Sequence, residues 1–153
     1  MRILVADDSP IFREVLQRML TGWGYEVVVA GDGEQAWTCL QAADAPKLAV
    51  LDWMMPGLDG LELCRQIRAT DVSDVYVVIV TAKTDPIDLL FAIEAGADDY
   101  LSKPLKSTEV RTRLRAACRI LELRQSLHTA PDDEMASECV GAAAQMAAAG
   151  AAI

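Results

Sequence analysis

The chain has 153 residues and a formal net charge of −9 at pH 7, with 52% hydrophobic and 24% charged residues. This length suits one ordinary domain with a buried core and a short extension. The acidic excess argues against direct nucleic-acid binding, and no apolar run approaches the roughly 18 residues that a membrane span needs.

The N-terminal residues run straight into an apolar strand and include no long apolar segment of the signal-peptide kind. The four cysteines are scattered, without Cys-x-x-Cys spacing: Cys39, Cys64, Cys118 and Cys139. This pattern favours free thiols in a reducing compartment over metal ligands. We therefore expect a cytoplasmic protein without membrane insertion.

Strand and helix signals alternate five times. The predicted strands span residues 3–6, 25–30, 48–52, 75–80 and 99–102, and the predicted helices span 10–22, 34–42, 61–68, 86–96 and 107–127. Ser9 before Pro10 and Asp85 before Pro86 are predicted N-caps. Alternation of this kind predicts a parallel sheet with helices on both faces.

Polar residues follow four of the predicted strands. Right-handed crossovers bring the carboxyl ends of parallel strands to one edge, where open α/β sheets bind ligands. The residues expected to meet there are Asp7, Asp8, Asp52, Thr81 and Lys103. A simpler alternative for Asp7 and Asp8 is a capping pair before the first helix.

This set of residues fits phosphoryl transfer. Three neighbouring carboxylates repel one another unless a cation lies among them, and ligands that are all oxygen favour a hard ion such as Mg²⁺. A lysine and a threonine hydroxyl can hold phosphoryl oxygens. A carboxylate can itself be the attacking group, which gives an acyl phosphate.

Several short motifs of the chain together resemble those of a known family. The residues that carry the resemblance are Asp7-Asp8, Asp52 with its Met-Pro-Gly-Leu-Asp-Gly sequel, Thr81-Ala82, Gly96-Ala97-Asp98-Asp99-Tyr100 and Lys103-Pro104. They resemble the receiver domain of two-component response regulators, a CheY-like phospho-acceptor domain. The resemblance implies a flavodoxin-like (βα)5 doubly wound α/β fold with strand order 2-1-3-4-5.

The resemblance also implies roles. Asp52 would accept a phosphoryl group from the phosphohistidine of a sensor histidine kinase or phosphotransfer protein. Asp8, Asp52 and the backbone carbonyl of Met54 would ligate Mg²⁺, or Mn²⁺, and Asp7 would act through water. Lys103 would pair with the phosphoryl group. The only histidine of the chain is His128, interpreted as a solvated residue, so the donor would be another protein or a small phosphodonor.

By the same resemblance, Lys103 and Pro104 would be joined by a cis peptide bond. Thr81 and Tyr100 would form the switch, with small Ala82 leaving the passage open. Met54 and Lys83 would flank the phosphoryl group, and neither suits the orientation of an attacking water. We therefore expect slow autodephosphorylation and a phosphorylated form that lives longer than minutes.

The expected output surface comprises the fourth helix, the fifth strand and the fifth helix. The fourth helix has more apolar residues than one buried face requires: Ile87, Leu89, Leu90, Phe91 and Ile93. The last helix has an inward stripe of Val110, Leu114, Ala117 and Leu121 and a second stripe of Ile120, Leu123 and Leu127. Either surface could form a homodimer, and Asp98 and Asp99 could pair with arginines across it.

We expect a receiver domain at 1–123, a continuation of the last helix at 124–128 and an alanine-rich tail at 129–153. The tail is either a flexible linker remnant or an extra helix that docks on the domain. The chain carries no signature of an output domain, so the downstream partner would be a separate protein or a domain outside this sequence.

One rival function is enzymatic. Haloacid-dehalogenase-type phosphatases, which are metal-dependent, also use an aspartate nucleophile, a threonine, a lysine and an acidic pair. Their nucleophile opens an Asp-x-Asp motif and their acidic pair comes last, whereas here Met54 lies two residues past Asp52 and the acidic pair leads. We therefore favour a signalling module over an enzyme.

Overall fold

The computed structural model describes residues 1–70, 72 and 74–128. In these residues, strands and helices alternate: β1 (Arg2–Ala6), α1 (Pro10–Gly22), β2 (Glu26–Ala30), α2 (Gly33–Leu40), β3 (Leu48–Asp52), α3 (Gly60–Arg68), β4 (Tyr76–Thr81), α4 (Pro86–Glu94), β5 (Asp99–Ser102) and α5 (Ser107–His128). The chain divides into two units, Met1–Arg119 and Ile120–Ile153. The predicted tail at 129–153 lies outside the described residues.

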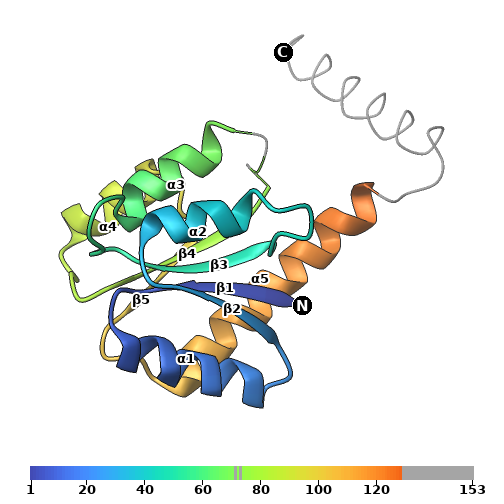
Figure 1. Ribbon diagram of the computed structural model, residues 1–153, viewed down its shortest axis with the longest axis horizontal. Helices are drawn as coiled ribbons and strands as arrows, with labels where there is room; N and C mark the ends of the chain where they lie inside the picture. Colours follow the sequence, from blue (N-terminus) through green and yellow to red (C-terminus); the bar gives the residue numbers. More distant parts are fainter. Residues whose placement is uncertain (71, 73, 129–153) are drawn as a thin grey trace, which may run out of the picture. The chain divides into compact units, whose positions relative to one another are not determined.

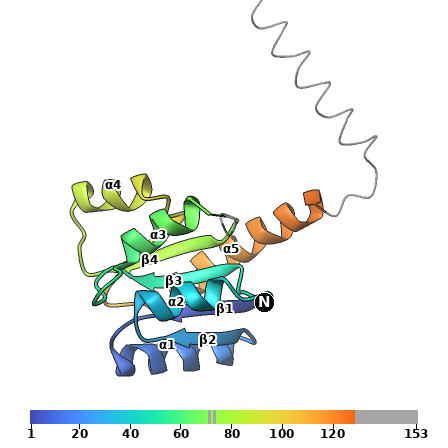
Figure 2. The ribbon, with the colours of Figure 1, turned by 45° about the horizontal axis from the view of Figure 1, so that its top comes forward.

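The sheet of the first unit is parallel, with strand order β2-β1-β3-β4-β5, which confirms the predicted fold class. Helix α1 and the first part of α5 cover one face, and α2, α3 and α4 cover the other (Figure 1; Figure 2). Strands β3 and β4 are buried along their whole length. Burial on both faces explains why their sequences are almost unbroken apolar runs.

Side-chain caps define the starts of three helices. The Oγ of Ser9 accepts the N–H of Phe12 at 3.3 Å and begins α1, as predicted. Asp32 and Asp59 cap α2 and α3 in the same way. The prediction for Asp85 was wrong in part, because this residue occupies the N-cap position of α4 but its side chain makes no capping hydrogen bond. The fixed φ of Pro86 remains as the local signal that begins α4.

A close backbone approach places α3 directly behind the end of β3. The N–H of Gly60 donates to the carbonyl of Trp53 at 2.9 Å. A Cβ at position 60 would overlap the carbonyl oxygen of Asp52. Only glycine therefore allows α3 to begin so close to the last residue of β3.

Apolar side chains are exposed in two of the helices. In α1, Leu16 and Leu20 are buried, but Val15 is 51% exposed, although it shares their helical spacing. In the second unit, Leu123 and Leu127 are 60% and 80% exposed. None of the described helices combines the length and the apolar character needed to cross a membrane.

Candidate functional site

Three carboxylates gather at the carboxyl edge of the sheet. Strands β1 and β3 are neighbours with Ala6 opposite Leu51, so the residues that follow, Asp7 and Asp52, lie side by side. Asp7 is 1% and Asp52 is 6% exposed, whereas Asp8 is exposed. One oxygen from each of the three acids lies within 4.8 Å of the others. This set contains only oxygen ligands and fits a hard divalent cation.

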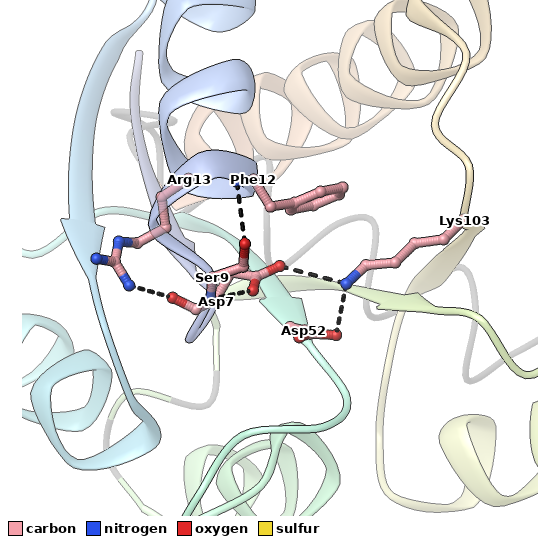
Figure 3. Close-up of polar contacts among 6 residues, drawn as sticks. All are labelled: Asp7, Ser9, Phe12, Arg13, Asp52 and Lys103. Atoms are coloured by element: carbon pink, nitrogen blue, oxygen red, sulfur yellow. Dashed lines mark hydrogen bonds and ion pairs between the residues drawn. The ribbon is translucent and has the colours of Figure 1, made fainter.

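Lys103, from the end of β5, reaches into the same place. Its Nζ donates to Asp7 Oδ2 at 3.4 Å and lies 3.3 Å from Asp52 Oδ1 (Figure 3). The backbone N–H of Lys103 donates to the carbonyl of Thr81 at 2.8 Å, which ties the end of β5 to the end of β4. The Lys103–Pro104 peptide bond is cis, as predicted.

The carboxylate of Asp7 is held from two directions. Its Oδ1 accepts the N–H of Ser9 at 2.9 Å, while Oδ2 faces Lys103. The guanidinium of Arg13 donates to the backbone carbonyl of Asp7 at 2.7 Å (Figure 3). These bonds fasten the first turn of α1 to the end of β1, so the orientation of Asp7 does not depend on Lys103 alone.

The environment of Asp52 disfavours its charged form. Burial, together with the neighbouring Asp7, raises the pKa of Asp52 to about 6, although Lys103 acts in the opposite direction. The lysine therefore compensates only part of the cost of burying a carboxylate beside another acid. Additional positive charge at this edge would stabilise ionised Asp52.

Thr81 ends β4 beside this cluster and is 2% exposed. Its Oγ accepts the backbone N–H of Lys83 at 2.9 Å, which leaves the hydroxyl proton available for another acceptor. In β5, Tyr100 lies opposite Ile79, is partly buried and lines a hollow of about 100 Å³ beside α4. The predicted flanking residues are all exposed: Met54, Ala82, Lys83 and Pro104.

Two contacts between a lysine and an aromatic ring at the site were not predicted from the sequence. The ammonium of Lys103 lies 4.3 Å from the centroid of the Phe12 ring, and that of Lys83 lies 4.7 Å from the centroid of Trp53. By its spacing in the sequence, Phe12 fits only the apolar stripe of α1. No spacing along the chain links a residue in the first helix to a lysine after the fifth strand.

The two acids before Tyr100 have partners within the same chain. Asp98 pairs with Arg68 at 2.6 Å and also accepts the N–H of Val77 at 2.8 Å. Asp99 pairs with Arg113 of α5 at 3.1 Å. The sequence had suggested pairs of these acids with arginines across a dimer, and the structure shows pairs inside one chain.

A five-stranded parallel sheet with an acidic cluster, a lysine and a threonine at its carboxyl edge defines the class of receiver-like α/β domains. A family model described as the response regulator receiver domain matches residues 3–115. The chain therefore belongs to the response regulator receiver family, and the phosphatase alternative is not favoured.

Individual relatives agree with this assignment. The DNA-binding response regulator MtrA of Mycolicibacterium smegmatis is 46% identical over 118 residues, which cover 77% of this chain and 50% of that protein. The response regulator MprA of Mycolicibacterium vanbaalenii is 44% identical over 132 residues, or 86% of this chain and 53% of that protein. The chain thus spans about half the length of these curated relatives.

Solved structures give the same fold. The receiver domain of sensor histidine kinase PA1611 from Pseudomonas aeruginosa, with a magnesium ion in its active-site cleft, superposes with a TM-score of 0.68 at 32% identity, covering 75% of this chain and 94% of that one. The chemotaxis protein CheY4 of Vibrio cholerae gives a TM-score of 0.70 at 27% identity, covering 75% and 96%.

Proposed function

We propose that Asp52 is the phospho-acceptor of this receiver domain. An oxygen of its carboxylate attacks the phosphorus of a phosphohistidine on a partner kinase or phosphotransfer protein. An O–P bond forms, the P–N bond to the imidazole breaks, and the imidazole nitrogen keeps the electron pair and takes up a proton. The observation that carries the proposal is the convergence of Asp52, Asp7, Lys103 and Thr81 from four strand ends.

Each neighbour has a role suited to its position. Lys103, 3.3 Å from Asp52, pairs with an oxygen of the transferred group. The Thr81 hydroxyl donates its proton to a second oxygen, since its own oxygen already accepts from Lys83. These contacts supply the charge stabilisation and positioning on which phosphoryl transfer mainly depends.

The acidic cluster suits a resident divalent cation. Asp8, Asp52 and the backbone carbonyl of Met54 would hold Mg²⁺ or Mn²⁺, and Asp7 would contact it through water. When bound, the ion supplies neutralising charge for the incoming phosphoryl oxygens. The all-oxygen donor set and the raised pKa of Asp52 both support this choice.

Phosphorylation by acetyl phosphate tests the proposal directly. The wild-type protein with Mg²⁺ should gain the mass of one phosphoryl group, and hydroxylamine should remove it because the product is an acyl phosphate. Beryllofluoride should change the fluorescence of Trp53, the residue next to the acceptor. Asp52→Ala should abolish both responses. Phosphorylation that persists in Asp52→Ala would refute the assignment.

We propose that phosphorylation is read out at the α4-β5-α5 surface through Thr81 and Tyr100. Movement of Thr81 toward the phosphoryl group would let Tyr100 turn inward, and this shifts an existing equilibrium. Four apolar side chains of α4 are 48–65% exposed and support a contact surface there: Ile87, Leu90, Phe91 and Ile93. A homodimer through this surface or through the end of α5, or a separate output protein, would be the partner.

The phosphorylated form should be long-lived. Met54 is 62% exposed and Lys83 stacks on Trp53, and neither side chain is an acid or amide that orients an attacking water. We therefore expect only slow autodephosphorylation. A lifetime of seconds, measured by mass spectrometry without any phosphatase, would contradict this expectation.

A further inference from the structure

The ammonium group of Lys103 has neighbours of two different kinds. Two of them are carboxylates, Asp52 at 3.3 Å and Asp7 at 3.4 Å. The third is the face of the Phe12 ring, whose centroid lies 4.3 Å from Nζ (Figure 3). The lysine side chain is 26% exposed, so most of its surface is covered by neighbouring groups.

The ring is attached to a fixed part of the fold. The backbone N–H of Phe12 donates to Ser9 Oγ at 3.3 Å, and the next residue, Arg13, donates to the backbone carbonyl of Asp7 at 2.7 Å. The first turn of α1 is thereby tied to the same strand end that supplies Asp7. The backbone that carries the ring consequently has a defined position relative to Asp7.

Lys103 by itself is far less constrained. Its ammonium is carried on a flexible stem of four methylene groups, and the two acids attract it without a fixed direction. The negative face of an aromatic ring attracts a cation and restricts it to the region above the ring. An aliphatic side chain of similar size would fill the space but would not provide this attraction.

We propose that Phe12 is a positioning residue that holds the Lys103 ammonium beside Asp52 through a cation–π contact. The proposal rests on the proposed function for its consequence, since Lys103 must lie where an oxygen of the phosphoryl group arrives. The negative charge of the ring face, rather than the apolar volume of the ring, then sets the rate at which the domain accepts a phosphoryl group.

The contact can be measured without metal or phosphoryl group. The ε-methylene protons of Lys103, assigned by comparison with Lys103→Arg, should be shifted upfield by the Phe12 ring current in the metal-free protein. Phe12→Leu should return them to ordinary lysine values, and Phe12→Tyr should keep the shift. Ordinary values in the wild type would overturn the contact itself, whether or not Asp52 is phosphorylated.

The effect of the ring on phosphorylation is tested with a series of side chains at position 12 that have nearly the same shape. Phenylalanine analogues with one, two and three ring fluorines weaken the negative ring face with little change of volume. Beryllofluoride affinity and the rate of phosphorylation by acetyl phosphate should fall stepwise along the series. In Phe12→Leu they should fall about 3- to 10-fold, with Phe12→Tyr within about twofold of wild type. Ile11→Ala, at a residue 76% exposed on the same helix, is the matched control and should match wild type.

The outcomes separate the two proposals. Equal losses in Phe12→Leu and Phe12→Tyr, or no trend with fluorination, would show that the ring acts only as packing and would overturn the positioning role. Absence of phosphorylation in wild-type protein, with the upfield shift of Lys103 present, would overturn the proposed function and leave the cation–π contact standing.

Discussion

Replacing the buried Asp52 by asparagine should stabilise the metal-free protein. Asp52 is 6% exposed, and burial together with Asp7 raises its pKa from 3.8 to about 6 despite the opposing effect of Lys103. Between these two values the folded state retains a proton that the unfolded state has released. The wild-type free energy of unfolding therefore falls as pH rises through this window. Asparagine carries no charge and removes this cost.

The size of the effect follows from the same two values. The difference between 3.8 and about 6 corresponds to about 3 kcal/mol, at about 1.36 kcal/mol per pKa unit. We expect Asp52→Asn to raise the free energy of unfolding by about 1–3 kcal/mol above about pH 7. The gain should fall to about half near pH 5 and become small below about pH 4, where both states of the wild type carry the proton.

Urea denaturation in EDTA, followed by circular dichroism at several pH values, measures this directly. Asp85→Asn is the matched control, because Asp85 is exposed and makes no side-chain capping bond. It should change the free energy of unfolding by less than about 0.5 kcal/mol at every pH. A gain in Asp52→Asn that does not depend on pH, or no gain above about pH 7, would refute the reasoning.

Three further predictions concern the scaffold and its thiols. Arg68→Ala should lower the free energy of unfolding by about 2–4 kcal/mol, because Arg68 donates hydrogen bonds to two backbone carbonyls and a carboxylate. The control is Arg65→Ala, at an exposed residue, which should lower it by less than about 0.5 kcal/mol. Equal melting temperatures for these two variants would contradict this. Gly60→Ala should destabilise by about 1–3 kcal/mol, since its Cβ would overlap the end of β3, whereas Gly22→Ala, which meets no atom within 4 Å, should be neutral or stabilising. Urea titrations that rank these variants in the reverse order would exclude the close approach. The Cys64 thiol is buried and its pKa is raised to about 11, so this thiol should react with DTNB only after the protein unfolds. Complete labelling of the native protein would contradict that burial.

The convergence of the acids could be predicted from sequence because it depends on local patterns. The apolar runs that end at Ala6, Asp52 and Thr81 predict buried strands, and the right-handed rule for parallel connections brings their carboxyl ends to one edge. The N-cap at Ser9 and the bounds of the strand at 48–52 could be predicted because they too depend on local patterns. Periodicity and turn chemistry act between residues that are close along the chain.

The roles of partly exposed side chains could not be predicted in this way. Val15 shares the helical spacing of Leu16 and is nevertheless exposed. Asp85 occupies the expected position before α4 and makes no cap. For Val15 the deciding factor is the orientation of α1 against the sheet, which the pattern within that helix does not contain. Nothing in the structure explains the missing cap at Asp85.

The sequence patterns by themselves therefore determined the parallel sheet and the set of polar residues at its carboxyl edge, and the resemblance to receiver domains implied the strand order. Only the tertiary structure decided that Lys103 lies over the Phe12 ring, that Lys83 lies over Trp53, and that burial raises the pKa of Asp52. These features depend on distances between side chains from different strands and helices. Such distances result from the packing of the whole domain, and no local pattern along the chain encodes them.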